Sequence, residues 1–297
     1  DHPDTLTARN NLAYAYEPVG RLNEAITLYE RTLDDRLRIL GPDNPSTFVS
    51  KNNLAVAYRA ANRLDEAHPL FEQAFADRLR VLGPDHPDTL VSHNNLAYSY
   101  RAMGNLEQAN ALYEQTLSDN LRILGPNHPN TIASRNNLAE TYMLSGHPDQ
   151  AIALYEQTLA DSLRILGPNH PNTLIFRNNL AVGYESAGRL DEAITLLKEV
   201  LVDSSRILGS DHSQTLVPRN NLARAYRTVG HFDKAILLFK QALADSLRLL
   251  GPNHPDTLAS RNNLIYTYLL AGRVEKALAY FDQPTDPDGT GTDRADS

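Results

Sequence analysis

The feature that most constrains the fold is an internal repeat with a period of 42 residues. The tripeptide Asn-Asn-Leu recurs at this spacing without an insertion or a deletion, so that seven copies account for nearly all of the 297 residues. The first Asn of each copy is Asn10, Asn52, Asn94, Asn136, Asn178, Asn220 and Asn262. A period of about 20–50 residues is typical of architectures in which each unit packs only on its neighbours. Length alone would suggest two ordinary domains, and the repeat replaces that interpretation.

Each unit is predicted to form two helices separated by turn residues. In the third unit the first helix should begin at Pro87-Asp88-Thr89, where Asp88 or Thr89 can cap the free N–H groups. It should end at Gly104, because glycine enters the left-handed region without a Cβ penalty. The second helix should begin near Glu107, whose charge suits the helix dipole. A Gly-Pro pair such as Gly83-Pro84 ends the second helix of most units.

Apolar residues recur along both helices with helical spacing, as Leu96, Ala97 and Tyr100 do in the third unit. One helix pair cannot bury such a face alone, so the units are expected to stack into an all-α solenoid of seven antiparallel helix pairs. The expected array covers residues 1–281, with repeats at approximately 1–40, 41–82, 83–124, 125–166, 167–208, 209–250 and 251–281. Residues 282–297 contain five acidic residues and one Arg, and they are expected to form an acidic disordered tail.

Three irregularities are expected to change the local geometry. Pro18 and Pro69 fall deep enough in their helices to kink or shorten them. The turn at residues 209–213, Gly-Ser-Asp-His-Ser, lacks both prolines of the other turns. Because two fixed φ angles are lost there, this joint should be softer than the others.

Composition and charge exclude several classes of function. The 36 Asp and Glu residues against 28 Lys and Arg give a net charge of −8, which argues against a dedicated nucleic-acid binder. The absence of cysteine excludes disulfides and thiolate zinc sites. No apolar run approaches the roughly 18 residues of a membrane helix, and we expect a cytoplasmic protein that does not act at a membrane. The N-terminus is neither a signal peptide nor an initiator Met, so further sequence is expected upstream.

No motif points to catalysis or to metal binding. Six of the ten histidines recur at one turn position, namely His2, His86, His128, His170, His212 and His254. Equivalent atoms of stacked repeats should be roughly 8–10 Å apart, whereas ligands of one zinc ion lie about 2.0–2.1 Å from it. A structural role in the turn is therefore expected. The phosphate-loop, hydrolase-elbow and zinc-protease motifs are missing from the sequence, and we expect no enzyme activity, metal or cofactor.

An Asp and an Arg three residues apart recur near the end of the second helix. The pairs are Asp35/Arg38, Asp77/Arg80, Asp119/Arg122, Asp161/Arg164, Asp203/Arg206 and Asp245/Arg248. An ion pair at this spacing contributes only about 0.2–0.5 kcal/mol, which does not explain its presence in six units. The Arg is therefore expected to bond the next repeat or the carbonyls of the Gly-Pro turn, with ligand anchoring as the alternative.

The Asn pair is unusual inside a helix, where Asn is up to about 0.7 kcal/mol less favourable than Ala. Its amides could bond between repeats, or they could line a ligand groove. Residues on the face of the first Asn change between units, since Tyr98 and Arg101 are replaced by Glu140 and Met143 in the next. A fixed Asn beside variable neighbours favours a groove for the first Asn, and the second is expected to be structural. The basic residue before each pair, such as Arg9, either flanks the groove or lies across a neighbouring helix.

The pattern N-L-A-x-x-Y-x-x-x-G-x-x-x-E-A-I-x-L-Y at residues 11–29 resembles the tetratricopeptide repeat. The segment L-G-P-D-H-P-D-T at residues 82–89 and the repeated R-N-N-L-A are similar to the 42-residue version found in kinesin light chains and in many bacterial, including actinobacterial, regulators. The resemblance covers residues 1 to about 281. It implies a right-handed superhelix whose first helices line a concave groove for a peptide or protein segment, with the first Asn contacting the bound peptide.

The sequence thus predicts a non-catalytic scaffold that binds a protein or peptide segment in its groove. Arg59, Arg101 and Arg227 are the candidates for contact with acidic segments. The expected groove residues are the seven first Asn residues together with Tyr14, Val56, Tyr98, Glu140, Val182, Arg224, Arg59, Arg101 and Arg227, and Tyr266 is a further pocket residue. Two alternatives stay open: a sensor or autoinhibitory module of a larger NTPase-type regulator, with an intramolecular partner domain upstream, and a self-associating structural array.

Overall fold

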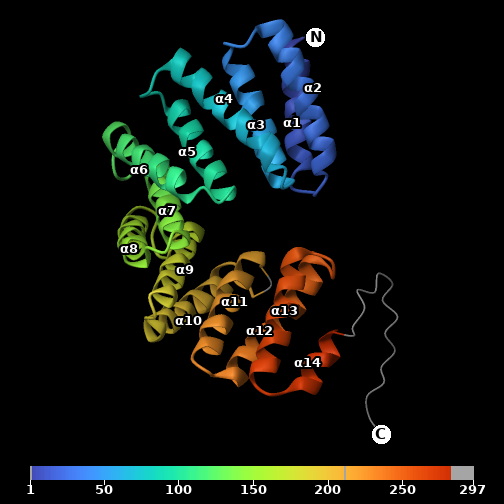
Figure 1. The fold of residues 1–297 in the computed structure, drawn as a ribbon, viewed down its shortest axis with the longest axis vertical. Helices are drawn as coiled ribbons and strands as arrows, with labels where there is room; N and C mark the ends of the chain where they lie inside the picture. The colour runs from blue at the N-terminus through green and yellow to red at the C-terminus, as the bar shows by residue number, and fades with distance from the viewer. Residues whose placement is uncertain (1, 211, 282–297) are drawn as a thin grey trace. The chain divides into compact units, whose positions relative to one another are not determined.

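The computed structural model describes residues 2–210 and 212–281, and every regular element within them is an α-helix (Figure 1). The helices are α1 (Pro3–Tyr16), α2 (Leu22–Leu40), α3 (Pro45–Ala60), α4 (Leu64–Leu82), α5 (Pro87–Ala102), α6 (Leu106–Ile123), α7 (Pro129–Leu144), α8 (Pro148–Ile165), α9 (Pro171–Ser186), α10 (Leu190–Ile207), α11 (Ser213–Thr228), α12 (Phe232–Leu250), α13 (Pro255–Leu270) and α14 (Val274–Phe281). The prediction of an all-α fold built from helix pairs is confirmed. The predicted acidic tail, residues 282–297, and Asp211 of the turn at residues 209–213 lie outside the described residues.

Contacts between residues divide the chain into two compact units, 1–154 and 155–297, with the boundary inside α8. In the first unit each helix from α1 to α7 packs on the next one, and in the second unit the same holds from α9 to α14. The first helices of neighbouring repeats also touch, α5 with α7 in the first unit and α9 with α11 in the second. Each unit therefore stacks helix pairs with their first helices side by side. A single continuous array over residues 1–281 stays a prediction.

Histidine caps the first helix of most repeats. Nδ1 of His86 accepts a hydrogen bond from the backbone N–H of Asp88 at 3.1 Å, and Pro87 occupies the first helical position. Asn44 has the same role before α3, where its Oδ1 accepts from the N–H of Ser46 at 2.9 Å. The same cap is formed by His2, His128, His170, His212 and His254. The structural role of these histidines is confirmed, but Asp88 and Thr89 are not the caps, because the true cap lies before the proline.

Glycines end the helices at the expected places. Gly104 follows α5 with a φ of 81°, and Gly83 follows α4 with a φ of 86°. In the second repeat Asn62 stands at the position of Gly104 and has a φ of 59°. Asn tolerates this left-handed conformation better than other residues with a Cβ. The local sequence therefore sets the turn between paired helices in the second repeat as it does in the others.

The prolines affect their helices unequally. Helix α1 ends at Tyr16 and has 14 residues against the 16 of α3, and Pro18 lies in the turn that follows. The expected shortening at Pro18 is thus confirmed. Helix α4 runs unbroken through Pro69 and has 19 residues, as α2 has without an internal proline, so the expected shortening at Pro69 is wrong. A third proline, Pro218, lies inside α11 and is buried.

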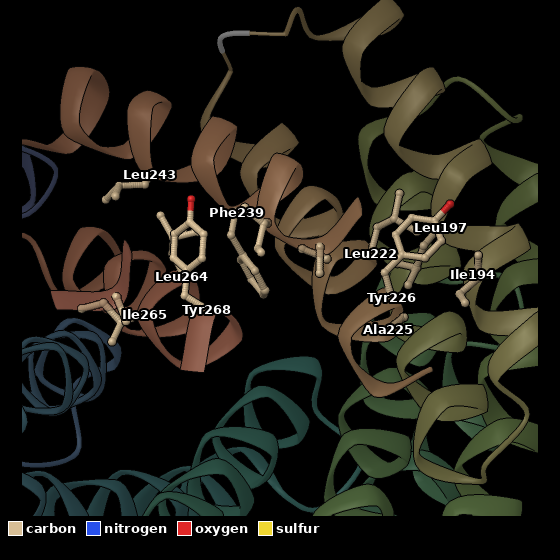
Figure 2. Packing of buried hydrophobic residues seen from close by; sticks show 14 of the residues in the cluster. Ile194, Leu197, Leu222, Ala225, Tyr226, Phe239, Leu243, Leu264, Ile265 and Tyr268 are labelled. Carbon is tan, nitrogen blue, oxygen red and sulfur yellow. The ribbon is translucent and has the colours of Figure 1, made fainter. Parts of the chain in front are cut away.

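The hydrophobic core runs between the helix pairs of each unit. Ala97 of α5 and Ala109 of α6 are fully buried, and their small side chains let the two helices approach closely. In the second unit Leu197, Tyr226 and Phe239 belong to one cluster that joins α10 to α13 (Figure 2). Each repeat thus fixes the orientation of the next one within its unit, and with it the side chains on the first helices.

Candidate functional site

The Asn pairs join neighbouring repeats through their side-chain amides. Nδ2 of the second Asn donates to Oδ1 of the first Asn one repeat earlier. The N–O distances are 3.2 Å for Asn53–Asn10, 2.8 Å for Asn95–Asn52, 3.1 Å for Asn137–Asn94 and 2.9 Å for Asn221–Asn178. The structural role expected for the second Asn is confirmed at these four positions. The first Asn accepts the same bond, which is the inter-repeat alternative that the sequence favoured less for this position.

This bond leaves the Nδ2 group of the first Asn available. Within the described residues, Nδ2 of Asn52, Asn94 and Asn178 donates to no protein acceptor. Asn136 differs, because its Nδ2 donates to Oε1 of Glu140 at 2.8 Å. Since the carbonyl end of each of these amides is held by the next repeat, the direction of the free N–H groups is fixed before any ligand arrives.

In the first unit a row of side chains links α3, α5 and α7. The ring of Tyr98 lies between two guanidinium groups, 4.3 Å from that of Arg59 and 4.6 Å from that of Arg101. Arg101 also forms an ion pair of 2.7 Å with Glu140, whose second oxygen accepts from Asn136. The structure therefore brings Arg59, Tyr98, Arg101, Glu140 and Asn136 together. The charge of Arg101 is compensated inside the protein, contrary to its expected availability for an acidic partner.

The equivalent row of the second unit lies on α9, α11 and α13. Arg224 forms a bidentate ion pair with Glu185, with N–O distances of 3.0 and 2.9 Å. Arg227 lies 5.0 Å over the ring of Tyr266, and its Nη1 donates to Oδ1 of Asn263 at 3.2 Å. Arg224 and Arg227 are thus held by neighbouring side chains. Val182 of α9 is half-buried.

The remaining predicted groove residues differ in exposure. Val56 of α3 is half-buried, while Tyr14 of α1 is 66% exposed. Asn220 has a buried Oδ1 without a hydrogen-bond partner among the described residues, and Asn262 is exposed. Asn10 accepts the inter-repeat bond from Asn53. Asn220 accepts no such bond among the described residues.

The basic residue before the Asn pair forms an ion pair within its own hairpin in four repeats, at Arg9, Lys51, Arg177 and Arg219. Nζ of Lys51 lies 2.5 Å from Asp77, and Nη1 of Arg177 lies 2.7 Å from Asp203. The acceptor is the Asp of the Asp/Arg pair on the second helix. Each of these side chains reaches from its first helix to the neighbouring second helix, as the second interpretation left open by the sequence expected, and ends there in an ion pair.

The Arg of the Asp/Arg pair bonds a side chain of the turn that precedes its hairpin. Arg122 contacts Asp119 at 3.0 Å and also Asp85 of that turn at 2.6 Å. Arg206 reaches Asn169 at 2.9 Å in the same way. A bond to the turn was expected, but its acceptor is the side chain after the Gly-Pro pair and not a carbonyl. This contact joins the end of the second helix to the turn before the first helix of the same hairpin. It adds to the ion pair between the two helices of the hairpin.

His93 breaks the series of ion pairs, because it occupies the position of Lys51 and Arg177. Its ring is buried and stacked on Phe75 at 4.7 Å, and Nδ1 lies 3.1 Å from Oγ1 of Thr116. Burial lowers the pKa of His93 below its usual value, although the carboxylate of Asp119 opposes the shift. The folded protein therefore favours the neutral ring.

We expect acid to destabilise the first unit through His93. Above the usual histidine pKa of about 6.5 the ring is neutral in both the folded and the unfolded protein. Below that pH the unfolded chain binds a proton while the folded protein still disfavours it. The free energy of unfolding therefore decreases as the pH falls toward the lower pKa of the folded state. Urea unfolding at pH 7.5 and 5.5 measures the effect. The free energy of unfolding should fall more for the wild type than for His93→Gln, and equal losses would contradict the assignment.

No helix of the described residues is long and apolar enough to cross a membrane. No group of three or more His, Asp or Glu side chains that could hold a metal ion occurs in residues 2–210 and 212–281. The chemistry that these surfaces offer is hydrogen bonding, ion pairing and aromatic contact.

Sequence models of the tetratricopeptide repeat match residues 4–80, 119–163, 149–201 and 176–247, and two further models of this repeat match residues 89–130 and 220–290. The chain belongs to the tetratricopeptide repeat (TPR) family. TPR proteins are generally non-catalytic and bind protein partners. None of the curated proteins compared with the chain matches it.

Several solved TPR structures resemble this chain. Repeats from Podosopora anserina, described as kinesin light chain nearly identical TPR-like repeats, are 33% identical with a TM-score of 0.62, covering 69% of this chain and 97% of that one. BtubC (BKLC) from P. vanneervenii is 20% identical with a TM-score of 0.55, covering 93% and 98%. A signal transduction ATPase with a TPR sensor from Pyrococcus horikoshii is 14% identical with a TM-score of 0.65, covering 94% of this chain and 41% of that one. The first likeness agrees with a TPR array of the kinesin-light-chain type, and the other two show the fold alone.

Proposed function

We propose that the face formed by the first helices binds an extended protein or peptide segment and that the chain is a non-catalytic scaffold. The observation that carries this proposal is the pair of unused amide donors at Asn52 and Asn94, each oriented by a bond to the next repeat. A peptide backbone offers carbonyl oxygens that such donors can bind whatever its sequence. Donors that are already oriented lose little conformational entropy when a ligand binds.

The side chains beside these donors suggest which segments bind the first unit. Arg59 has no carboxylate within ion-pair distance among the described residues, while Glu140 neutralises Arg101. Tyr98 offers an aromatic surface between the two guanidinium groups. We therefore expect a segment with an isolated acidic residue to bind better than a polyacidic one, because only one positive charge of this row is uncompensated.

A change of Asn to Asp tests the role of the donors. The variant Asn52→Asp/Asn94→Asp keeps an oxygen that accepts the inter-repeat bond but removes the free Nδ2 donors. We expect peptides selected from a random library on the wild-type chain to bind this variant about thirtyfold more weakly, since each of the two lost hydrogen bonds is worth roughly 1 kcal/mol. Isothermal titration calorimetry with the selected peptides measures the difference.

The variant Gln108→Glu is the matched control for the added charge. It makes the same amide-to-acid change at an exposed residue of α6, which is a second helix. Its affinity should stay within twofold of the wild type. Unchanged affinity of Asn52→Asp/Asn94→Asp, with an unchanged melting temperature, would contradict a peptide-binding role for the Asn row. Alanine would be a poorer choice, because it also removes the acceptor of the inter-repeat bond.

A role as the sensor or autoinhibitory module of a larger regulator would use the same face for an intramolecular segment. Self-association would use it, or the ends of the units, for a second copy. Both stay predictions, and the variants above apply to the first of them without change.

A further inference from the structure

One position between neighbouring repeats is filled differently along the chain. In the first two repeats an Arg near the end of the second helix is buried and bonds a Ser of the next first helix; Nη1 of Arg36 lies 2.8 Å from Oγ of Ser50, and Arg78 bonds Ser92 in the same way. In the third repeat Asn120 replaces the Arg and bonds Ser134 at 2.7 Å. A polar side chain thus occupies part of the cleft between these hairpins and forms a hydrogen bond across it.

Between α10 and α11 of the second unit the corresponding residues are Ser204 and Pro218. The Ser side chain is short, and the Pro ring cannot form the hydrogen bond. A pocket of about 260 Å³ lies at this place. Its apolar lining includes Leu174, Ile175, Val200, Leu208, Val217 and Pro218. The cleft beside Asn120 and Ser134 measures only about 130 Å³, so the pocket is twice as large where the polar pair is missing.

The pocket is large enough for a big apolar side chain. A protein cavity of 150 Å³ lined by Leu, Ile and Phe stays dry and binds benzene, and this pocket exceeds that volume. Leu174 and Val200 are buried at its base, whereas Ile175 and Val217 are 41% and 52% exposed. The pocket therefore opens to solvent between two apolar residues.

Polar groups suited to a peptide backbone lie at the same place. Asn178 lines the pocket; its Oδ1 accepts from Asn221, and its Nδ2 donates to no described residue. Pro218 has no N–H group to offer the carbonyl of Gln214, which is four residues earlier in α11 and also lines the pocket. A donor and an acceptor thus flank an apolar cavity, as a site for one residue of a peptide requires.

From this arrangement we infer that the pocket between α9, α10 and α11 binds a phenylalanine-sized apolar side chain of the partner segment and so determines specificity. The inference rests on the proposed peptide-binding function and adds to it a place and a side-chain class. The Asn row binds backbone groups that all peptides share, whereas this pocket distinguishes one side chain from another.

The probe for this site is N-acetyl-L-phenylalanine amide, followed through the methyl NMR signals of Ile175 and Val217. The wild-type chain should show saturable shifts at both residues. The variant Ser204→Asn/Pro218→Ser copies the pair at Asn120 and Ser134, and it should bind the probe at least tenfold more weakly. Equal binding by the two proteins, or shifts confined to other methyl groups, would overturn the inference.

A second variant guards against a failure of the first to fold. Ile175→Gln changes an exposed residue at the mouth of the pocket, so the fold should be kept while probe affinity falls. The outcomes also separate this inference from the proposed function. Peptides that bind through Asn52 and Asn94 while the probe does not bind would refute the pocket alone. Probe binding together with unchanged peptide affinity of Asn52→Asp/Asn94→Asp would refute the Asn row alone.

Discussion

Replacing Phe239 with Ala is expected to lower the free energy of unfolding of the second unit by about 3–5 kcal/mol. The ring is fully buried, and Figure 2 shows it between Leu222 of α11 and Tyr268 of α13, which belong to the same cluster. Its removal takes apolar surface from the core and leaves a cavity between α11, α12 and α13, which cannot easily close. Because Leu222 belongs to the same repeat as Phe239 and Tyr268 to the next one, the loss should weaken both the packing within the sixth repeat and its contact with the seventh.

Urea unfolding followed by circular dichroism measures this effect. The control is Leu237→Ala on the same helix, where the side chain is 58% exposed and the expected change is within about 0.5 kcal/mol. A loss below about 1 kcal/mol for Phe239→Ala would show that the cluster around α12 does not hold the second unit together.

Removing the carboxylate of Asp245 is expected to cost about 3 kcal/mol, although this residue lies at the end of a helix near the surface. Its partner Arg219 has a side chain that is only 8% exposed. In Asp245→Ala the guanidinium stays buried without its counter-charge, and that desolvated charge is the source of the loss. The weak contact from Arg219 to the carbonyl oxygen of Ser210, at 3.4 Å, does not replace it.

Two further variants isolate the buried charge as the cause. Arg248→Ala removes the other, half-exposed partner of Asp245 and should cost less than about 1 kcal/mol. Arg219→Met/Asp245→Leu removes both charges and should recover most of the stability lost in Asp245→Ala. If Asp245→Ala is no more destabilised than Arg248→Ala, the charge of Arg219 is not desolvated in the way that the structure indicates.

The parts of the fold that depend on local conformation could be predicted from the sequence. Gly83 and Gly104 mark helix ends because a residue with a positive φ is needed there, and this requirement acts within a few residues of the chain. Pro18 shortens α1 for an equally local reason, since proline cannot donate within the helix. The helix pairs and their 42-residue period follow from such positions together with the apolar spacing.

Side-chain partners could not be predicted with the same certainty. Every donor in the repeat has several acceptors at the same period, and the sequence does not show which of them it reaches. The amide of Asn95 could have bonded a backbone group or a ligand, and only the packing of α3 on α5 places it beside Asn52. Asp88 is a common capping residue, but the cap of α5 is His86, which lies before the proline. The equivalent residue of the second repeat is Asn44, and both side chains present a hydrogen-bond acceptor. This exchange between repeats indicates the capping position.

The pocket of the second unit does not follow from the residues that the repeats share, because it arises where a shared Ser is lost. Pro218 stands where Ser50, Ser92 and Ser134 stand in other repeats, and that departure was visible in the sequence. Its consequence, an unfilled space beside Ser204, requires the distance between α10 and α11.

The Asn–Asn bond gives recognition a direction along the chain. The amide that would bind a ligand belongs to one repeat, but the group that orients it belongs to the repeat that follows. Separation of a repeat from its C-terminal neighbour therefore releases its amide, whereas separation from its N-terminal neighbour leaves the amide held. A ligand that binds the oriented amide more tightly than the released one shifts the equilibrium toward the state in which the Asn–Asn bond to the following repeat is formed. Occupation of the groove would thus stiffen each unit toward its C-terminal side.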